Sequence, residues 1–511
     1  MRNVALTLLL SVVALHGQET QPGGARMVTL SDCIKAALEQ NLSIRVDSYS
    51  PKITSILEKS AKSAFDPVFK STVQDYGSQN VRTNVFSPSS TNVSQWDFSF
   101  AQALPTSTSY SISLTNQRTA TDSTYSNFNP YFDVSLGLRV TQPVLRGFGP
   151  KIAQNQLLIA RKSAESSEYQ FRSSITGVIT QVQQTYWNLV YSLANLEVQQ
   201  QSLKLAQDLL EQNKIRVQVG TLAPIDILQS EAEVASREEG ILVAESAVQN
   251  YEDSLKRLMN LPGDAADWST TIRPADEPIF EPKQVAEPEM VSTALEHRPD
   301  LTQLRIDLSA KDISLSYAKN QLRPDLSLYA QAGSNGVGGN ILVREFPGGP
   351  ITETIPGGYG DAIGDALKWK NRNWTLGFTF TLPIKNQAAR AAHERATLEK
   401  LQASHRIHNL EQQVYQEVRT ACRQVDTNRK RVDATRAALR LAEKKLEAEQ
   451  KKYSVGLSTN YFVLQFQKDL AQARTNELQA ITDYNLSLAD LDRVTGMSLE
   501  RNGVKIEGYL K

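Results

Sequence analysis

The stretch VQQTYWNLVYSLANLEVQQQSLKLAQDLLEQNKIRV (residues 182–217) decides the fold, because an apolar residue recurs in it at every seventh position. A sustained heptad predicts a long helix with one narrow apolar seam that lies along other helices. A second stretch with the same spacing, residues 418–453, follows 236 positions later. Recurrence at a fixed offset indicates that the whole structural unit is duplicated. The paired seam positions are Val182 and Val418, Leu189 and Val425, Leu196 and Val432, Leu203 and Leu439, Leu210 and Leu446, and Val217 and Tyr453.

Composition and targeting signals narrow the class of protein. The 55 Lys and Arg residues balance 55 Asp and Glu residues, so no net charge favours nucleic acid as a partner. Residues 1–17 hold a short apolar core after Arg2 and predict a secretory signal peptide. No later stretch has the roughly 18 to 20 apolar residues of a spanning helix, so any membrane crossing must use strands. Cys33 and Cys422 are expected to be two buried or semi-buried thiols, and a disulfide between them stays open.

The duplication predicts an α+β membrane protein in which each copy has the order helix, strands, long helix, tip and shorter return helix. The first copy is expected at 27–262 and the second at 286–497, with a linker of little regular structure at 263–285 and a C-terminal tail at 498–511. The first helix is expected at about 29–64, where Ser31 can cap it. In the first copy the strands are expected at about 66–142 and the helical hairpin at about 151–260; in the second they are expected at about 325–382 and about 386–495.

Helix lengths constrain how the pieces pack. A long helix of about 68 residues spans roughly 100 Å, whereas a return helix of about 37 residues spans roughly 55 Å. The helix that precedes the strands can fill the difference by stacking end to end on the return helix. The polar neighbours of the seam fit either a helical wall that is wet on both sides or a coiled-coil rod.

The strand segments favour a membrane protein over a rod. Residues 96–100, 110–114, 132–140 and 374–382 alternate apolar with small or polar side chains, which is the period of transmembrane barrel strands. Residues 68–76 alternate less clearly, and the glycine-rich stretch 333–364 is interpreted as a flexible extracellular loop. So few strands cannot close a barrel, and an open edge is not tolerated in lipid, so several copies must share one barrel.

In these features the chain resembles the TolC-like outer-membrane efflux proteins along essentially its whole mature length. The resemblance rests on Leu30 to Asn41 (LSDCIKAALEQN), on Thr141 to Gly149 (TQPVLRGFG), and on the tips Val219-Gly220-Thr221 and Tyr453 to Leu457 (YSVGL), in this order within a duplicated frame. It implies a homotrimer that forms an outer-membrane β-barrel, continued by an α-helical barrel across the periplasm. It also implies docking onto a periplasmic adaptor (membrane fusion) protein, and through it an inner-membrane transporter, in a tripartite efflux pump or type I secretion system.

The resemblance also suggests site residues. The adaptor-docking tips would be Val219, Gly220, Thr221, Leu222, Val455, Gly456, Leu457 and Ser458; the glycines can equally serve only to make tight turns. In the family a tyrosine before the second tip bonds to an aspartate after the first, which here are Tyr453 and Asp226. The two acidic gate positions fall on Phe462 and Gln465, and the arginine of the same network falls on Ser458, so the charged constriction is missing. We therefore expect Phe462 to close the pore by apolar contact, with packing between helices as the alternative.

No enzyme chemistry is indicated. His393-Glu394 lacks the second histidine of a zinc-protease helix, and the glycine-rich stretch lacks the Gly-Lys-Ser/Thr of a phosphate loop. We expect no catalytic, cofactor or metal site. The leading hypothesis is a passive, gated export duct in the outer membrane, in contact with its lipid, and the alternative is an exported coiled-coil scaffold without a pore.

Overall fold

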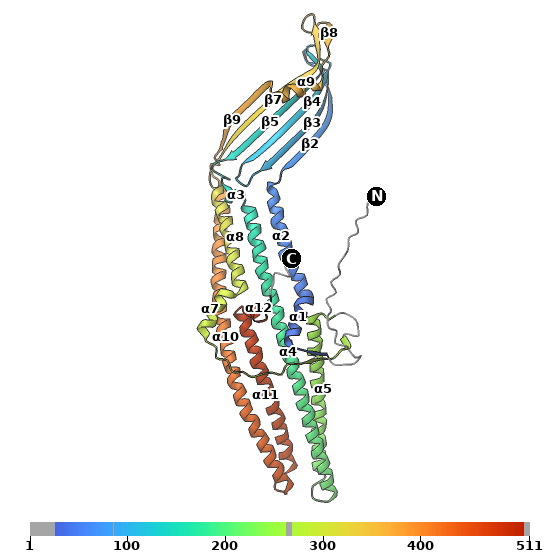
Figure 1. Cartoon of the computed structure of the whole chain (residues 1–511), viewed down its shortest axis with the longest axis vertical. Helices are drawn as coiled ribbons and strands as arrows, with labels where there is room; N and C mark the ends of the chain where they lie inside the picture. The colour runs from blue at the N-terminus through green and yellow to red at the C-terminus, as the bar shows by residue number, and fades with distance from the viewer. Residues whose placement is uncertain (1–25, 85, 262–267, 505–511) are drawn as a thin grey trace, which may run out of the picture. The chain divides into compact units, whose positions relative to one another are not determined.

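The computed structural model describes residues 26–84, 86–261 and 268–504 (Figure 1). The chain divides into two compact units: unit 1 comprises residues 1–49, 171–299 and 411–511, and unit 2 comprises residues 50–170 and 300–410. Each unit draws on both copies of the duplicated sequence. The expected signal peptide and the end of the expected tail lie outside the described residues.

Unit 2 contains an antiparallel sheet whose strands follow chain order (Figure 1). Within its described residues, six long strands form the path β2–β3–β4–β5–β7–β9, and the short β8 pairs only with the far end of β7. The first copy supplies four of these strands, including the weakly patterned first one, and the second copy supplies two. The bounds are β2 Val68–Gln79, β3 Ser90–Ala103, β4 Ser109–Thr121, β5 Phe128–Pro143, β7 Asp325–Arg344, β8 Ile351–Ile355 and β9 Asn371–Thr381.

One face of this sheet is apolar and the other is polar. Cross-strand partners lie on the same face, so the register assigns every side chain: Phe100 pairs with Ile112, whereas Ser99 pairs with Ser113. The predicted period of two is therefore confirmed across the sheet. The apolar face carries Phe69, Val73, Trp96, Phe98, Phe100, Ile112, Leu114, Phe132, Val134, Leu136, Leu138, Val140, Leu328, Trp374, Leu376, Phe378 and Phe380. The polar face carries Lys70, Thr72, Gln74, Gln95, Ser99, Ser111, Ser113, Ser135, Arg139, Gln331, Asn335, Asn373, Thr375 and Thr379.

The interpretation of 333–364 as a flexible loop is wrong. The strand β7 continues to Arg344, a hairpin leads into β8, and the helix α9 (Tyr359–Leu367) follows. Gly333, Gly336 and Gly338 lie inside the strand at points where another backbone approaches closely, which is the usual reason for glycine within a strand.

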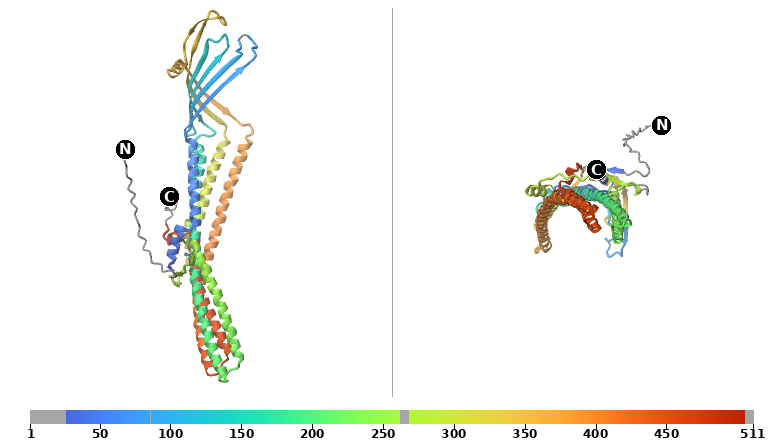
Figure 2. Two further views of the ribbon diagram at one scale, coloured as in Figure 1. Left: turned by 90° about the vertical axis from the view of Figure 1, so that its right-hand side faces the viewer. Right: turned by 90° about the horizontal axis from the view of Figure 1, so that it is seen from below.

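Unit 1 holds the paired ends of two helical hairpins, which lie side by side (Figure 2). The first hairpin consists of α4 (Asn155–Gln218) and α5 (Ile225–Met259), and the second of α10 (Gln387–Ser454) and α11 (Asn460–Val494). The long helices α4 and α10 also contribute residues to unit 2. A short helix, α3 (Pro150–Ala153), precedes α4, and α12 (Ser498–Arg501) follows α11.

The helix before each set of strands is in two parts rather than one. The predicted helix at 29–64 is α1 (Leu30–Gln40) and α2 (Leu42–Lys62), followed by a 3₁₀ turn at Ser63–Phe65. Asn41 interrupts it because its side-chain oxygen accepts a hydrogen bond from the Ser43 amide (2.9 Å), and such local bonds compete with the helix. The cap is Thr29 rather than Ser31, since the Thr29 hydroxyl accepts from the Asp32 amide.

The second copy breaks at the equivalent place, between α7 (Glu287–His297) and α8 (Pro299–Gln321). Arg298 is extended (φ −66°, ψ 123°) because a residue before proline is disfavoured in the helical region.

The end of each return helix meets this break in unit 1, as the helix lengths predict. The Asn41 side-chain amide donates to the Leu258 carbonyl (2.8 Å), and Asn260 donates to the Gln40 carbonyl (3.0 Å). In the second copy, Arg298 donates to the Val494 carbonyl (3.5 Å). Within unit 1 these bonds place the end of each return helix at the break, and the end-to-end stacking of α2 and α8 on the return helices stays a prediction.

The expected linker at 263–285 contains a strand. Its residues β6 (Ile272–Pro274) pair in parallel with β1 (Arg26–Val28). The Tyr186 hydroxyl donates to Asp276 (2.8 Å) just after β6, which ties the segment to α4.

The predicted heptad seam is buried throughout most of α10 but only at the start of α4. Val418, Val425, Val432, Leu446 and Tyr453 are buried. In the first copy Val182 and Leu189 are buried, whereas further along Ser202 and Leu209 are buried, each one residue before a seam position. Asn213, four residues before the seam position Val217, is buried as well. A helix of 3.6 residues per turn drifts against a seven-residue repeat, so the contact stripe moves to neighbouring positions.

Two further expectations concern the cysteines and helices that could span a membrane. Cys33 and Cys422 are free and buried, as expected. Within the described ranges, no helix combines the length and hydropathy that a membrane span requires.

Candidate functional site

The two hairpins of unit 1 end in turns of the same construction. After α4, the Thr221 amide donates to the Arg216 carbonyl (2.9 Å) around Gly220, whose φ is +76°. After α10, the Leu457 amide donates to the Lys452 carbonyl (2.9 Å) around Gly456, whose φ is +79°. This is the glycine-terminated helix end in which only glycine adopts the left-handed conformation without strain. The glycine alternative weighed from the sequence is therefore realised at both tips.

The tips also expose apolar side chains that a turn alone does not need. Val219, Val455 and Leu457 are 66%, 69% and 79% exposed. Gly220, Thr221 and Gly456 are exposed as well, whereas Leu222 and Ser458 are half-buried. Six of the eight predicted docking residues are therefore exposed, and they form two small surfaces, one at the end of each hairpin.

A buried polar cluster joins the two hairpins just behind the tips. Asn213 on α4 donates through its side-chain amide to Asn460 on α11 (2.7 Å) and to Ser230 on α5 (2.9 Å). Tyr453 on α10 donates from its hydroxyl to the Asn213 side-chain oxygen (2.5 Å). Asn213, Ser230 and Asn460 are fully buried, and Tyr453 is 4% exposed. We call Asn213, Ser230, Tyr453 and Asn460 the tip latch, because each comes from a different helix.

The tip latch replaces the predicted bond between Tyr453 and Asp226. The Tyr453 hydroxyl bonds to Asn213 instead, and Asp226 takes part through its backbone carbonyl, which accepts from Asn460 (3.2 Å) and Ser230 (2.9 Å). Arg216 lies over the Tyr453 ring at 4.4 Å and donates to the Tyr453 carbonyl (3.2 Å). Burial raises the pKa of the Tyr453 hydroxyl, so this group stays a neutral donor.

The predicted gate positions lie on an exposed face of α11. Phe462 is 48% exposed, and its ring lies 5.6 Å from that of Tyr461. Gln465 is exposed one turn later and donates to Asp469 (2.8 Å). Phe462 is therefore only partly covered within its own chain. Asp469 lies seven residues after Phe462, which places an acidic group on the same face of the helix.

Ser458, which occupies the arginine position of the family network, bonds to Glu449 on α10. The Ser458 hydroxyl and the Lys452 ammonium (3.2 Å) hold the pKa of the Glu449 carboxyl below its ordinary value. The second tip is thus fastened to its own long helix.

The residues that sequence reasoning missed are Asn213, Ser230 and Asn460. Each is a small polar residue on an otherwise ordinary amphipathic helix. None of the three recurs in the other copy at the offset of 236, where Asn213 corresponds to Glu449, Ser230 to Phe466 and Asn460 to Pro224. Their burial depends on four helices meeting at one level, which no single heptad reveals.

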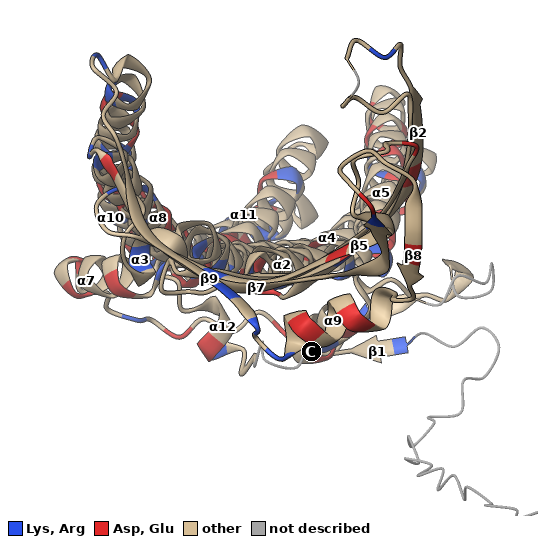
Figure 3. Ribbon diagram, turned by 90° about the horizontal axis from the view of Figure 1, so that it is seen from above, with Lys and Arg blue, Asp and Glu red and all other residues tan. Residues whose placement is uncertain are grey.

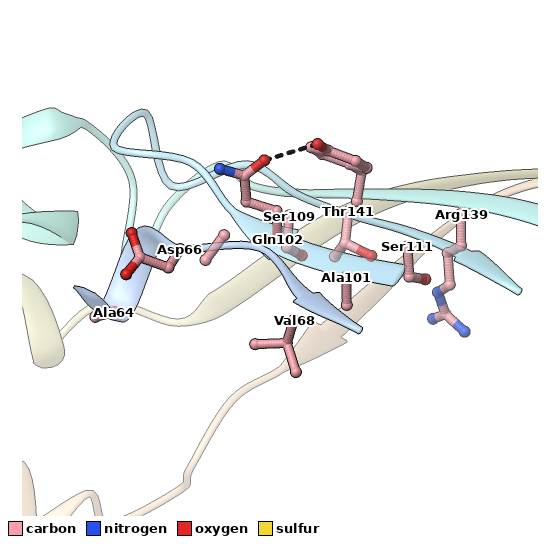
Figure 4. A pocket seen from close by; sticks show the side chains of 11 residues that line it. Ala64, Asp66, Val68, Ala101, Gln102, Ser109, Ser111, Arg139 and Thr141 are labelled. Atoms are coloured by element: carbon pink, nitrogen blue, oxygen red, sulfur yellow. Dashed lines mark hydrogen bonds between the residues drawn. The ribbon is translucent and has the colours of Figure 1, made fainter. Parts of the chain in front are cut away.

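Unit 2 has a hollow of about 340 Å³ at the end of the sheet nearest the helices (Figure 4). Asp66 and Arg139 line it together with hydroxyl groups, and Tyr110 donates to Gln102 there (2.7 Å). The Arg139 guanidinium lies over the Tyr329 ring at 5.1 Å. The lining offers no histidine or cysteine, so it suggests a wet surface rather than a reaction site. Among the described residues, no group of three or more His, Cys, Asp or Glu side chains could hold a metal ion.

Comparisons with known proteins agree with this arrangement. A family model described as outer membrane efflux protein matches residues 101–261 and 290–497. Comparison with curated proteins finds no match.

Several solved structures have a similar fold. The CmeC outer membrane channel of Campylobacter jejuni matches with a TM-score of 0.63 and 18% identity, covering 92% of this chain and 86% of that one. The outer membrane protein VceC of Vibrio cholerae matches with a TM-score of 0.65 and 16% identity, covering 91% and 96%. The open state of the MtrE outer membrane channel of Neisseria gonorrhoeae matches with a TM-score of 0.62 and 17% identity, covering 92% and 89%.

Proposed function

We propose a working arrangement for this chain, which belongs to the outer membrane efflux protein family and is an outer-membrane efflux channel that extends into the periplasm. Three copies assemble around one axis into a tunnel, with a shared β-barrel in the membrane and a helical barrel below it. The tunnel is a passive duct without enzymatic activity, and partner proteins supply the energy. Family membership favours this duct over the coiled-coil scaffold.

The observation that carries the proposal is the open sheet of unit 2, which is apolar on one face. Among the residues that the structure describes, its two edge strands, β2 and β9, pair on one side only. Its six long strands alternate in direction, so β2 and β9 run in opposite directions. The β9 edge of one copy can therefore pair antiparallel with the β2 edge of the next. An unpaired edge in lipid leaves backbone groups without partners, so the sheet needs neighbours on both sides.

The strand number sets the size of the barrel. The sheet has six long strands within its described residues, four from the first copy and two from the second. Three copies would then form a barrel of about eighteen strands, a size that leaves a water-filled channel. The polar face, with Arg139, Gln331 and Thr375, would line this channel.

The helix α2 also favours neighbouring copies. Its side chains Val46, Tyr49, Ile53 and Ile56 follow a spacing of three or four residues and are 56% to 66% exposed. Such a stripe is an apolar seam without a partner in its own chain. A helix of an adjacent copy would cover it and make the wall of the helical barrel continuous.

The exposed tip surfaces support docking of a periplasmic adaptor protein. Val219, Val455 and Leu457 present apolar contacts at the ends of rigid helical hairpins, and the two surfaces are duplicated as the chain is. An adaptor protein that binds both tip surfaces with the same kind of contact would match this duplication. The inner-membrane transporter would connect to the channel through this adaptor.

The tip latch and Phe462 form the gate of the closed channel. The latch joins the two hairpins within each chain, and Phe462 from three copies would meet on the axis as an apolar ring that expels water. Opening would separate the hairpins and replace the latch bonds by bonds to water. Gln465 and Asp469 would lie next to this ring and keep the adjoining lumen wet.

Cysteine pairs across the strand edges test the assembly. The Thr72→Cys and Thr375→Cys substitutions lie on the polar face of β2 and β9, and the native cysteines are buried. A single chain does not fix the register between β9 of one copy and β2 of the next. The pairs Lys70→Cys with Thr375→Cys and Gln74→Cys with Thr375→Cys are therefore tested as well, because they shift this register by two residues in either direction. After oxidation in membranes and denaturation without reductant, we expect at least one pair to give covalently linked trimers, whereas the single variants should run as separate chains. Ladders beyond three chains, or no crosslink in any pair, would contradict the shared trimeric barrel.

A further inference from the structure

The helix α9 lies on the apolar face of the sheet, on its convex side (Figure 3). Ala362 and Ala366 on α9 and Val134 on β5 are all fully buried against one another. The strands begin and end near the helices at Val68 and Thr381, so Val134 belongs to the half of the sheet that is remote from them. A helix therefore covers part of a surface whose remainder would face lipid.

The contact is built into the sequence of both elements. A side chain at Gly336 would place its Cβ 1.8 Å from the Ala362 carbonyl oxygen, and one at Gly338 would place it 2.3 Å from the Gly358 carbonyl oxygen. The Tyr359 hydroxyl donates to the Asn116 side chain (2.8 Å), a polar group that is fully buried on the apolar face. The glycines of β7 and the bond from Tyr359 therefore make the packing of α9 on the sheet a specific contact.

The outer side of α9 and the turn after it have the composition of a membrane interface. Leu367 and Trp369 are 59% and 41% exposed, and Lys368 lies between them. Tryptophan is enriched at the level of lipid headgroups, and lysine and arginine place their charges there while their stems stay in apolar surroundings.

The charges of this segment are unevenly matched. Lys370 pairs with Asp365 (3.0 Å), and Asp361 accepts from the Gly358 amide (2.8 Å) at the helix start. Within the residues that the structure describes, Lys368 and Arg372 have no ion-pair partner. By register Arg372 lies on the apolar face of β9, where a cation facing lipid is stable only near the headgroups. Two cations beside an exposed tryptophan are complementary to a layer of anionic headgroups.

We infer that α9 and the segment Leu367–Arg372 form an interfacial anchor, in which Leu367 and Trp369 enter the outer leaflet and Lys368 and Arg372 bind phosphate groups of its lipid headgroups. The inference rests on the proposed membrane insertion of the sheet. The anchor fixes the depth and tilt of the barrel on one side of each copy. A role of α9 inside the channel is inconsistent with its place on the convex, apolar face.

Collisional accessibility of single spin labels tests the anchor in the full-length protein reconstituted in vesicles. Labels are placed by Trp369→Cys, by Leu376→Cys on the exposed apolar face of β9, and by Thr354→Cys in the β8 hairpin. We expect the ratio of oxygen to nickel-chelate accessibility to be high at 376, low at 354 and intermediate at 369. A label at 369 as accessible to the nickel chelate as that at 354 would overturn the anchor. A water-accessible label at 376 would instead show that the sheet is not inserted, which refutes the proposed function.

The headgroup contact is tested by changing the lipid. In vesicles containing phosphatidylglycerol, the double variant Lys368→Gln with Arg372→Gln should move the label at 369 towards water, whereas in pure phosphatidylcholine it should not. The variant Lys385→Gln is the matched control, because it removes an exposed lysine after β9 at the other end of the sheet. An equal shift in both lipids, or no shift in either, would contradict recognition of anionic headgroups.

Discussion

The Tyr453→Phe substitution tests the tip latch with the smallest change of shape. It removes one hydroxyl and leaves the Asn213 side-chain oxygen, fully buried, without its donor at 2.5 Å. A buried acceptor left unpaired costs about 1–3 kcal/mol, and this cost applies only to the closed state, because in the open state water reaches the group. The equilibrium between open and closed tips should therefore shift by roughly 5- to 150-fold for each chain that opens.

The shift is measured as open probability in planar bilayers with the purified protein. Tyr415→Phe is the control, because this tyrosine lies on the same helix, is 47% exposed and loses the same hydroxyl. We expect longer or more frequent openings in Tyr453→Phe and wild-type behaviour in Tyr415→Phe. The reasoning fails if both variants match the wild type, since the latch would then contribute nothing to closure.

A further test is the double variant Tyr453→Phe with Asn213→Leu. Removing both partners leaves no unpaired acceptor on Asn213, but it also removes the donors to Asn460 and Ser230 (2.7 and 2.9 Å). Its effect on open probability should differ from the product of the two single effects, because residues in one hydrogen-bond network are coupled. Strict additivity would mean that the tyrosine and the asparagine act separately.

Three further predictions concern the gate and the helix α9. Phe462→Ala should raise leakage through the closed channel, whereas Phe462→Leu should keep leakage as low as in the wild type, because an apolar ring needs bulk rather than aromaticity. Equal conductance in both variants and the wild type would count against the ring. Closed-state leakage should be constant from about pH 6 to about pH 9, because the latch consists of amides and hydroxyls. Burial raises the pKa of the Tyr453 hydroxyl above its ordinary value of 10.0. The stabilisation of the closed state by this hydroxyl is therefore fully present below pH 10.0 and is lost only as the pH rises through the raised pKa. Gly336→Val should lower the thermal stability of the sheet by about 1–3 kcal/mol, whereas Gly364→Ala, on α9 with open space around its added Cβ, should not; unchanged unfolding in both would show that α9 does not pack as described.

Much of the helical frame could be predicted because it depends on local periodicity. The positions of α5, α10 and α11 follow from heptads, prolines and tip glycines, signals that lie within a few residues of the elements they determine. The breaks at Asn41 and Arg298 were harder to predict, because both neighbouring segments have strong helical patterns. At Asn41 the local bond from the Ser43 amide is joined by a bond to the Leu258 carbonyl, a contact 217 residues away that the sequence does not reveal.

The strands were harder to predict from the sequence than the helices. Regular alternation identified three strands of the first copy, and the fourth, β2, was only weakly patterned. The strand β7 loses its alternation at Gly333, Gly336 and Gly338, so the sequence was interpreted as a loop there. Those glycines are present because Asn373 and α9 approach the strand closely, contacts that join residues far apart in the chain or across a turn. Period-based reasoning misses a strand whose composition is set by what covers it.

The proposed tip latch offers a reason why the two positions that are acidic in the family, Phe462 and Gln465, can be uncharged here. A charged ring closes a pore only if its charges are balanced by partners such as the arginine that Ser458 replaces. Without that arginine, acids at Phe462 and Gln465 would repel one another across the axis of the proposed trimer. A neutral latch needs no such balance: its donors and acceptors are satisfied within each chain, and burial protects them from water and salt. We therefore expect an arginine at Ser458 and acids at Phe462 and Gln465 to depend on one another in their effect on closure. Restoring an acid through Phe462→Glu alone should open the channel, whereas adding Ser458→Arg should partly close it again.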